Sequence, residues 1–479
     1  MIRRILALLF IAGLAAASAV YSPSVNLISG DAVKPHSITV QARDLALVCP
    51  GAAFVSGSST KVGSFSQSGS ASVFTHQAAI DGIQTSATLF GSASQPLSGA
   101  ESTFGASKSV VISSSDPGSL IEQGSALLTA TQMQLKQDAD MSGLAATGCQ
   151  RPGSDIWLVG GDTRTGRESL LILANPTAVD ATIELQLLAS NGYLNVPGLS
   201  AISVPSHRSV IVPINGLAPK LQTFSVHVSA RGGSVAAWIQ QKTVRGLHAG
   251  GFDLIAPANP ASTHLNIPGL LIRGTAAVAE LNKLSSNYFD VVDTLRVANT
   301  SGSDAHILAQ ITGSNAKTFG TVIQATVPAN TTADLEISGL SDGDYSIAIT
   351  SDQPVRAAAK LNRSNVTSKP ETDFTWLPAV SAAAGSRYLA VPSQGISKLA
   401  VVNASKTVAH ITVRSGGTSN VFELKPGSLT SVKVAAGSLM INSDAAVAAT
   451  LVIDVSSSVA SVPMVEYRNI GGQISVVVR

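Results

Sequence analysis

The chain has 479 residues, of which 45% are hydrophobic and 13% are charged, and its formal net charge at pH 7 is +2. This length exceeds what one hydrophobic core holds, so it predicts three or four domains. The apolar content predicts a globular protein rather than a disordered chain. So small a net charge, without Lys/Arg clusters among aromatic residues, argues against nucleic acid binding. Aromatic residues make up only 4% of the chain and leave few stacking platforms for bases or sugars.

The first 24 residues predict export. Arg3 and Arg4 precede a stretch of apolar and small residues that runs to Val20, and ASA at 17–19 fits the cleavage pattern of a signal peptide. The stretch is short for a membrane span, which needs about 20 residues, so we favour a cleaved signal peptide over an uncleaved anchor. In both cases positive charge stays on the cytoplasmic side. We therefore predict an extracytoplasmic protein, secreted or anchored by a single N-terminal transmembrane segment, which contacts the membrane only through that segment.

Residues 25–152 are rich in Ser, Gly and Ala, and their apolar alternation is weak. Cys49 and Cys149 are the only two cysteines of the chain and bracket most of this segment. In an exported protein they predict one disulfide, with two buried free thiols as the alternative. The bond would close a loop of about 100 residues and stabilise the fold by on the order of 4–5 kcal/mol in the chain-entropy model. We expect a separate β module whose poor core depends on this disulfide.

One phrase occurs three times beyond residue 152. An apolar strand ends at Asn175, Asn299 or Asn403, a polar turn follows, and Ala-x-Ile begins six positions after each Asn. The Asn side chain can hydrogen-bond the local backbone in such a turn. The segments that follow alternate apolar and polar residues, which is typical of a half-buried strand in an antiparallel sheet. These three asparagines therefore mark a repeated turn.

Further strand and turn patterns recur in the same register. Each copy holds about seven short strands in roughly 90–120 residues, at the spacing of a β-sandwich, and no segment beyond residue 25 shows sustained helical periodicity. We predict an all-β chain of tandem immunoglobulin-like β-sandwich modules behind an N-terminal disulfide-closed β module. The predicted divisions are 1–24 for the signal peptide or anchor, 25–152 for the N-terminal module, and 153–262, 263–386 and 387–479 for three sandwich repeats.

Several short motifs together resemble one family. They are LVCPG at 47–51, GC at 148–149, DIWLVGG at 155–161 and LILANP at 171–176. With the exported N-terminus, they are similar to an uncharacterised actinobacterial family, known only as a domain of unknown function, of exported or N-terminally anchored all-β envelope proteins. The resemblance covers most of the chain from about residue 37 and implies topology and compartment. The family has no established catalytic residues, so the resemblance implies no mechanism.

No pattern in the sequence indicates a catalytic, cofactor or metal site. The eight histidines are scattered, and no Cys pair has zinc spacing. His306 and His410 follow the repeated Asn and are expected on the solvent side of their strands. Asp342-Gly343-Asp344 is expected to be a hairpin turn rather than a calcium site. The three tryptophans are expected to pack in cores rather than to form a sugar platform.

These observations favour a non-catalytic structural or interaction protein of the cell envelope, without a cofactor, whose partner is an unknown envelope protein or a cell-wall glycan. One alternative is a cell-wall glycan-binding protein, which exposed aromatic residues lining one groove would support. The other is an enzyme of unrecognised type. A deep pocket with coupled, pKa-shifted carboxylates or a Ser/His pair would support that alternative.

Overall fold

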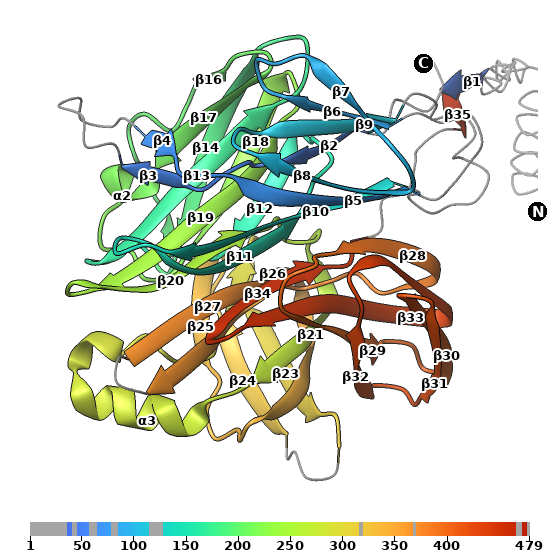
Figure 1. Ribbon diagram of the computed structural model, residues 1–479. Coiled ribbons are helices and arrows are strands. Elements are labelled where there is room, and N and C mark those ends of the chain that lie inside the picture. Colours follow the sequence, from blue (N-terminus) through green and yellow to red (C-terminus); the bar gives the residue numbers. More distant parts are fainter. Residues whose placement is uncertain are drawn as a thin grey trace, which may run out of the picture. The chain divides into compact units, whose positions relative to one another are not determined.

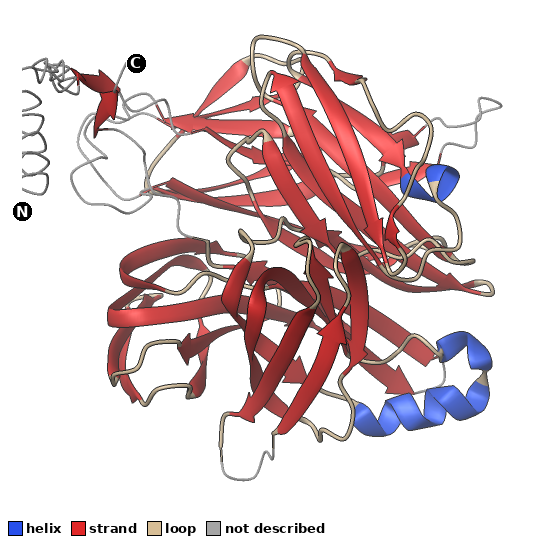
Figure 2. Ribbon diagram, turned by 180° about the vertical axis from the view of Figure 1, so that it is seen from behind, coloured by secondary structure: helices blue, strands red, loops and turns tan. Residues whose placement is uncertain are grey.

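A computed structural model describes residues 36–40, 46–56, 65–77, 85–114, 128–315, 320–366, 370–465 and 472–476. The predicted all-β fold class is confirmed, and strands dominate the ribbon (Figure 2). The chain divides into two units, Met1–Ala42 with Gly471–Arg479, and Arg43–Ile470. In the first unit, β1 (His36–Val40) pairs antiparallel with β35 (Gly472–Val476).

The predicted export segment, residues 1–24, lies outside the described residues. Among the helices that the structure describes, none is long and apolar enough to cross a membrane.

Four sets of strands in the unit Arg43–Ile470 pair in one common order. We call them module 1 (β2–β11), module 2 (β12–β20), module 3 (β21–β27) and module 4 (β28–β34). In each module one sheet joins the first, sixth, third and fourth strands, and the other joins the fifth, second, seventh and eighth. In modules 3 and 4 one long strand, β26 or β33, supplies both the sixth and the seventh position. Each module thus has eight strand positions, where the sequence predicts about seven for each of the three repeats.

The strands of module 1 are β2 (Ala46–Cys49), β5 (Ala71–Gln77), β6 (Thr85–Leu89), β7 (Ser94–Leu97), β8 (Glu101–Ala106), β9 (Val110–Ser114), β10 (Leu128–Gln137) and β11 (Ser142–Gly148), with an extra hairpin of β3 (Phe54–Ser56) and β4 (Phe65–Gln67). Those of module 2 are β12 (Asp155–Val159), β13 (Arg167–Asn175), β14 (Ala181–Ala189), β16 (Ile202–Val204), β17 (Arg208–Pro213), β18 (Phe224–Gly232), β19 (Ala236–Arg245) and β20 (His248–Ile255), with the short extra strand β15 (Gly192–Tyr193) and helix α2 (Ile214–Leu217). Those of module 3 are β21 (Ser262–Ile272), β22 (Thr294–Asn299), β23 (Ala305–Gly313), β24 (Thr321–Val327), β25 (Thr331–Glu336), β26 (Gly343–Val366) and β27 (Pro370–Pro378). Those of module 4 are β28 (Ala383–Val391), β29 (Ile396–Asn403), β30 (Ala409–Ser415), β31 (Thr418–Leu424), β32 (Leu429–Val434), β33 (Gly437–Val455) and β34 (Ser458–Pro463).

The two sheets of a module enclose a shared apolar core. In module 2, the sheet with β14 contributes Ile183 and the sheet with β13 contributes Leu171 to one buried cluster. Along β14, buried and exposed residues alternate from Ala181 to Gln186, because successive side chains of a strand point to opposite faces. The immunoglobulin-like subtype stays a prediction.

The eighth strands of the four modules meet at the centre of the unit (Figure 1). β20 packs against β11 and β27, and β34 packs against β27 and β11, so the four strands form a closed ring. The apolar clusters cross the module borders. Trp376 of module 3 belongs to the core of module 2, and Val452 of module 4 belongs to that of module 3. The modules therefore share their cores, whereas the repeats in the sequence suggest that each closes its own.

Module 1 has the strand order of the three repeats, although its sequence shows no sign of it. The sequence shows no sustained helical periodicity beyond residue 25, yet the structure has helix α3 (Thr275–Leu284), which with the 3₁₀ turn η2 (Ser286–Tyr288) connects β21 to β22. The segment TAAVAELNKL consists largely of good helix formers and lacks a side-chain cap, so propensity rather than a capping signal marks it.

The predicted domain boundaries stay predictions. The division between residues 152 and 153 falls between β11 and β12. The one between 262 and 263 follows the first residue of β21, and the one between 386 and 387 lies inside β28.

Candidate functional site

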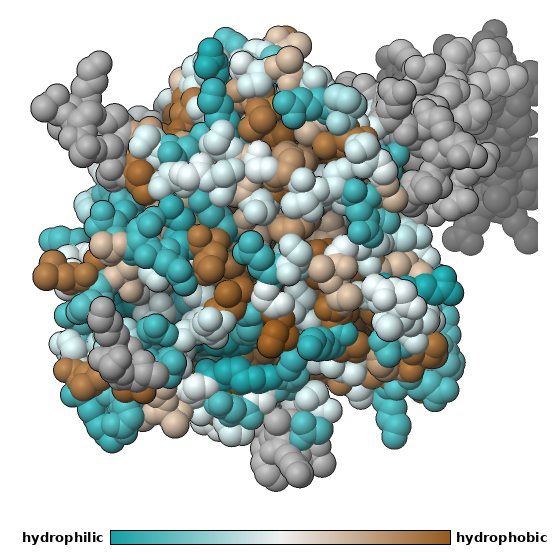
Figure 3. Space-filling model, viewed as in Figure 1, coloured by the Kyte–Doolittle hydropathy of each residue, from teal (hydrophilic) through white to brown (hydrophobic). Residues whose placement is uncertain are grey.

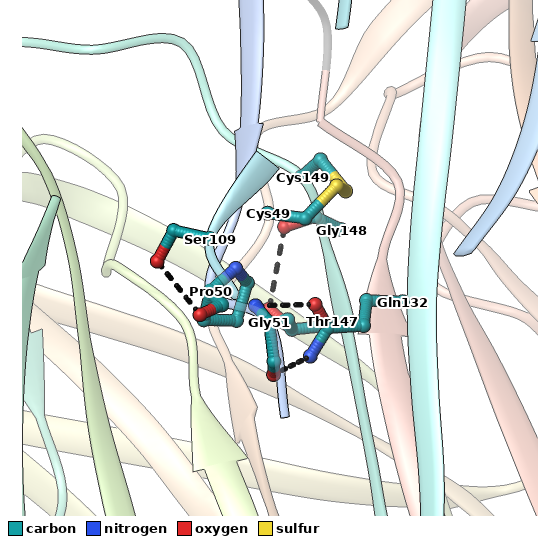
Figure 4. Close-up of a disulfide and its surroundings, with 8 residues drawn as sticks. All are labelled: Cys49, Pro50, Gly51, Ser109, Gln132, Thr147, Gly148 and Cys149. Atoms are coloured by element: carbon teal, nitrogen blue, oxygen red, sulfur yellow. Dashed lines mark hydrogen bonds between the residues drawn. A yellow bond between two sulfur atoms is a disulfide. The ribbon is translucent and has the colours of Figure 1, made fainter. Parts of the chain in front are cut away.

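The predicted disulfide between Cys49 and Cys149 is present and buried (Figure 4). Cys49 ends β2, the first strand of one sheet, and Cys149 directly follows β11, the eighth strand of the other sheet. Their Cα atoms lie 4.4 Å apart across a sequence separation of 100 residues. The bond therefore joins the beginning and the end of module 1 and links its two sheets.

Glutamine side chains support the chain next to this disulfide. The amide of Gln132 accepts a hydrogen bond from the backbone N–H of Gly51 and donates one to the carbonyl of Gly51, both at 2.7 Å. Gly51 has a φ of +82°, and a Cβ atom there would lie 2.3 Å from the backbone of Lys108, so only glycine fits. Gln240 of module 2 makes the same pair of bonds with Phe54. Buried backbone groups of module 1 thus obtain partners from side chains.

The three repeated asparagines occupy equivalent places, and all are fully buried. In module 4, the amide N–H groups of Asn403 donate to the carbonyls of Thr407 and Leu424, and its side-chain oxygen accepts from the backbone N–H and hydroxyl of Ser405. Asn175 and Asn299 make the same four bonds. Each Asn closes its own turn and fastens the second strand to the end of the fourth. They do not converge on a shared cavity.

His306 and His410 are exposed on their strands, and each is paired with an aspartate. The Nδ1 atom of His410 lies 2.7 Å from Asp444, and that of His306 lies 2.7 Å from Asp352. The carboxylate of Asp444 raises the pKa of His410. In both pairs the aspartate also accepts the backbone N–H of the histidine. The pairs tie neighbouring strands together at the surface.

Asp342 and Asp344 already have protein partners. Asp342 accepts hydrogen bonds from the backbone N–H groups of Gly274 and Thr275 at the start of α3, and Asp344 pairs with Arg273. Within the described residues, no group of three His, Cys, Asp or Glu side chains could hold a metal ion.

The three tryptophans are buried. Trp238 is fully enclosed, and Trp376 is 3% exposed. The ring of Trp157 stacks on the imidazole of His227 at a centroid distance of 4.5 Å, and the guanidinium of Arg356 lies 4.7 Å from its centroid. A sugar platform needs an exposed aromatic face, and none of these rings offers one.

A buried cluster of charged residues lies at the junction of modules 2 and 3. Asp290, in the segment after α3, accepts hydrogen bonds from Arg167 and Arg245 of module 2. Lys360 of module 3 donates to the Asp290 carbonyl at 3.1 Å. These cations hold the pKa of Asp290 far below its usual range, although burial opposes the shift. The cluster anchors the helical insertion to the module next to it.

Arg296 fastens module 3 to module 2 at the same junction. Its guanidinium donates to the carbonyls of Gly161, Gln222 and Phe224 and pairs with Asp334 through two bonds of 2.6 and 2.8 Å. The Arg296 charge lowers the pKa of Asp334 against a burial effect that raises it. Every donor nitrogen of this buried guanidinium has an acceptor, which is what a charged group needs away from water.

An open polar groove of about 520 Å³ borders this junction. Its lining includes the side chains of Ser190, Lys220, Gln222, Thr331 and Asp334. Lys220, with a φ of +64°, adopts a left-handed backbone conformation that is uncommon outside glycine. Hydroxyl, amide and charged groups thus face one surface depression.

A second, mainly apolar cavity of about 160 Å³ lies beside the disulfide. Cys149, Ile156, Arg387, Tyr388 and Pro463 contribute to its wall. Ligand pockets usually enclose about 300–1,000 Å³, so this cavity is small for an organic ligand.

Two aspartates are buried where the eighth strands meet. The carboxylate of Asp373 on β27 accepts backbone N–H bonds from Leu144 of module 1, Phe252 of module 2 and Val459 of module 4. Burial raises the pKa of Asp373 to about 7, although its backbone N–H donors lower it. Burial also raises the pKa of Asp253 on β20, and the neighbouring Asp373 charge adds to that shift. These two carboxyl groups are the part of the centre that can change charge.

None of these junction residues was singled out from the sequence. A usable signal does exist for the two central aspartates. In GFDLI (251–255) and TDFTWLP (372–378) a single aspartate interrupts an otherwise apolar or small strand. An aspartate in a buried strand needs hydrogen-bond partners, but the sequence does not show which strands supply them.

Comparisons with known proteins give a family but no activity. No curated protein matches the chain. One similar solved structure is from a bacterial ice-binding adhesin (12% identity, 66% of this chain and 98% of that chain covered, TM-score 0.12). Another is from a Ca²⁺-stabilised adhesin of an Antarctic bacterium (10%, 83% and 94%, TM-score 0.11), and a third is the BSP domain of a biofilm-associated protein (10%, 91% and 98%, TM-score 0.13).

At such TM-scores these likenesses carry no argument about fold or function. The model of one protein family, by contrast, matches more than half of the sequence. The chain belongs to the family of unknown function DUF5719, whose model matches residues 100–438.

Proposed function

We propose that this protein is a non-catalytic structural or interaction protein of the cell envelope that works outside the cytoplasm. The observation that carries this proposal is the closed ring of β11, β20, β27 and β34, which joins four modules into one body. Strands that form a shared core cannot slide or open without exposing apolar surface to water. The fold is therefore suited to hold outward-facing loops and strand edges at fixed positions.

The buried charges support the same proposal. Arg296 of module 3 binds backbone carbonyls of module 2, and Asp290 binds cations from two modules. These groups form their hydrogen bonds across the contact between modules, whereas a catalytic group must be able to reach a substrate.

The surface offers dispersed contact points. On the face shown in Figure 3, hydrophobic residues occur in several separate groups among polar ones. Large apolar side chains stand out singly, such as Leu247 at 92% exposure and Val421 at 70%. The buried disulfide supports the compartment, because such bonds persist in oxidising surroundings.

Photo-crosslinking in intact cells tests this proposal. A photoreactive residue at Leu247 or Val421 should capture envelope proteins, whereas the same residue at exposed Lys406 reports non-specific capture. We expect adducts that are enriched at least fivefold over the control position. Turnover of a substrate by the purified protein, with no enriched adduct in cells, would overturn the proposal.

A second candidate function is binding of a cell-wall glycan, favoured by the polar groove between modules 2 and 3. Hydroxyl and amide groups at Ser190, Gln222 and Thr331 can exchange hydrogen bonds with sugar hydroxyls. Retention on purified cell wall measures this directly. The double variant Ser190→Ala/Gln222→Ala should lose most of the retention, and Gln324→Ala on exposed β24 should keep it. Equal retention of both variants excludes the groove as the glycan site.

A further inference from the structure

Asp253, Thr375 and Ser461 form a chain of oxygen atoms that crosses three modules. The Oδ1 atom of Asp253 lies 3.3 Å from the hydroxyl of Thr375, which lies 3.1 Å from the hydroxyl of Ser461. The Ser461 hydroxyl in turn lies 3.0 Å from the carbonyl oxygen of Trp376. Asp253 belongs to module 2, Thr375 and Trp376 belong to module 3, and Ser461 belongs to module 4.

These three contacts require three hydrogen atoms. Each hydroxyl supplies one hydrogen, and the carbonyl of Trp376 supplies none. If Ser461 donates to that carbonyl and Thr375 donates to Ser461, the contact between Thr375 and Asp253 needs a hydrogen from the carboxyl group. An ionised Asp253 would leave one oxygen–oxygen contact of the chain without a hydrogen.

The other oxygen of Asp253 needs no proton. Its Oδ2 atom accepts the backbone N–H of Trp376 at 2.7 Å. A neutral carboxyl group with Oδ1 as donor and Oδ2 as acceptor therefore satisfies the contacts of Asp253 with both Thr375 and Trp376. Asp253 is 1% exposed, so water is not at hand to replace a missing partner.

Asp373 differs from Asp253 because both of its oxygens already accept N–H bonds. Oδ2 accepts from Leu144 at 2.9 Å and from Val459 at 3.1 Å, and Oδ1 accepts from Phe252 at 3.1 Å. Hydrogen bonds of this kind favour the charged form of a carboxyl group. Of the two neighbouring groups, Asp373 is therefore the one that ionises first as the pH rises.

We propose that Asp253 is a proton-binding site, and that its proton completes the hydrogen-bond chain that joins modules 2, 3 and 4 at the centre of the ring. The free energy of unfolding that this contact among modules 2, 3 and 4 contributes then depends on the pH of the surrounding medium. This inference goes beyond the proposed function and does not depend on it, because it concerns how the four modules are held together.

The charged groups around the centre have partners of their own. β11 and β34 carry no titratable side chain. Those on the other central strands and on the strands paired with them are Lys136 on β10, Lys242 and Arg245 on β19, His248 and Asp253 on β20, Asp344, Tyr345, Asp352, Arg356, Lys360 and Arg363 on β26, Glu371 and Asp373 on β27, and Asp444 and Asp454 on β33. Arg363, which lies opposite Asp373 in the strand register, binds Asp454 and the carbonyl of Leu271. Lys136 and Lys242 form ion pairs with Asp138 and Glu168. Among the interactions shown for the described residues, no cation contacts either central carboxyl group.

The direction of the pH effect follows from linkage. Burial raises the pKa of Asp253 in the folded state, whereas the unfolded chain ionises near its ordinary value of 3.8. Stability from this proton is complete below that value and is lost as the pH rises through the folded-state pKa. Between these two values the unfolding equilibrium constant rises about tenfold per pH unit through this group.

The variant Asp253→Asn tests the proposal, because an asparagine has the shape and donor pattern of the neutral carboxyl group. Its amide can donate to Thr375 while its oxygen accepts from Trp376. We expect the ratio of unfolding constants, wild type over variant, to rise about tenfold per pH unit from about pH 5 upward. A ratio that stays constant with pH would show that Asp253 carries no proton in the folded protein.

Asp373→Asn is the matched comparison. Its amide N–H₂ would face one of the backbone N–H donors, so we expect it to lower the unfolding midpoint at every pH. If Asp253→Asn fails to fold, the ¹³Cγ shift of Asp253 in the wild-type protein decides the question. A shift that titrates with a pKa above the ordinary value of 3.8 supports the proposal, and a shift that stays typical of a carboxylate down to that value overturns it.

Discussion

Module 1 and module 4 have the same strand order, but different interactions stabilise it in each. In module 4, Asn403 fastens the second strand to the fourth, and branched aliphatic residues such as Ile411 and Val413 fill the core. In module 1, a disulfide joins the first strand to the end of the eighth, and Gln132 supports the backbone at Gly51. The pairing order therefore does not depend on one turn motif. It needs two facing sheets and some means of fastening their ends.

The largest expected effect on stability comes from removing the disulfide of module 1. Replacing both Cys49 and Cys149 by Ser should lower the free energy of unfolding by on the order of 4–5 kcal/mol, because the unfolded chain regains the entropy of a loop of about 100 residues. Urea unfolding followed by tryptophan fluorescence measures the loss, because Trp238 belongs to the same buried apolar cluster as Val48 of module 1.

Reduction of the wild-type protein with dithiothreitol is the matched control and should reproduce the loss. If neither treatment moves the urea midpoint, module 1 does not depend on its disulfide.

The next effect tests whether the modules depend on one another. Arg296→Met should cost about 3 kcal/mol, because it leaves the half-buried Asp334 carboxylate without its cation and removes the bonds of the guanidinium to three carbonyls of module 2. Thermal unfolding measures it, with Arg414→Met on an exposed position of β30 as the control. Hydrogen exchange should rise in modules 2 and 3 together. A rise confined to module 3 would contradict the shared junction.

A smaller effect is expected from the turn that modules 2–4 share and module 1 lacks. Asn403→Ala removes four hydrogen bonds and should cost about 2–3 kcal/mol, since the buried carbonyl of Leu424 loses the side-chain donor that Asn403 supplies. Hydrogen exchange should increase at residues 404–408 and stay unchanged in module 1. Ser405→Ala is the control with the smaller loss. Equal costs for both variants would show that the Asn amide does not hold the turn.

The smallest effect concerns the surface His–Asp pairs of modules 3 and 4. Asp444 raises the pKa of His410, so the stability from this pair is present below pH 6.5 and is lost as the pH rises through the folded-state pKa. Proton NMR titration should find the His410 pKa above its ordinary value and a lower one in Asp444→Asn. Glu423→Gln should change it less. An unaltered pKa in Asp444→Asn would show that the pair does not form in solution.

The sequence by itself determined the fold class, the repeated turn and the disulfide partners. Strand alternation and turn chemistry are local, so residues a few positions apart already show them, as around Asn175, Asn299 and Asn403. The disulfide followed from two cysteines alone, because two residues allow one pairing. The function that these features favour stays a proposal.

Only the tertiary structure decided that module 1 is a fourth copy of the strand order and that the eighth strands close a ring. Module 1 is built from Ser, Gly and Ala, whose weak alternation conceals its strands. The bonds of Asp373 to Leu144, Phe252 and Val459 join residues that are separated by 86–229 positions in the chain. No local pattern encodes such partners, because a buried aspartate is stabilised by whichever N–H groups the completed fold brings to it.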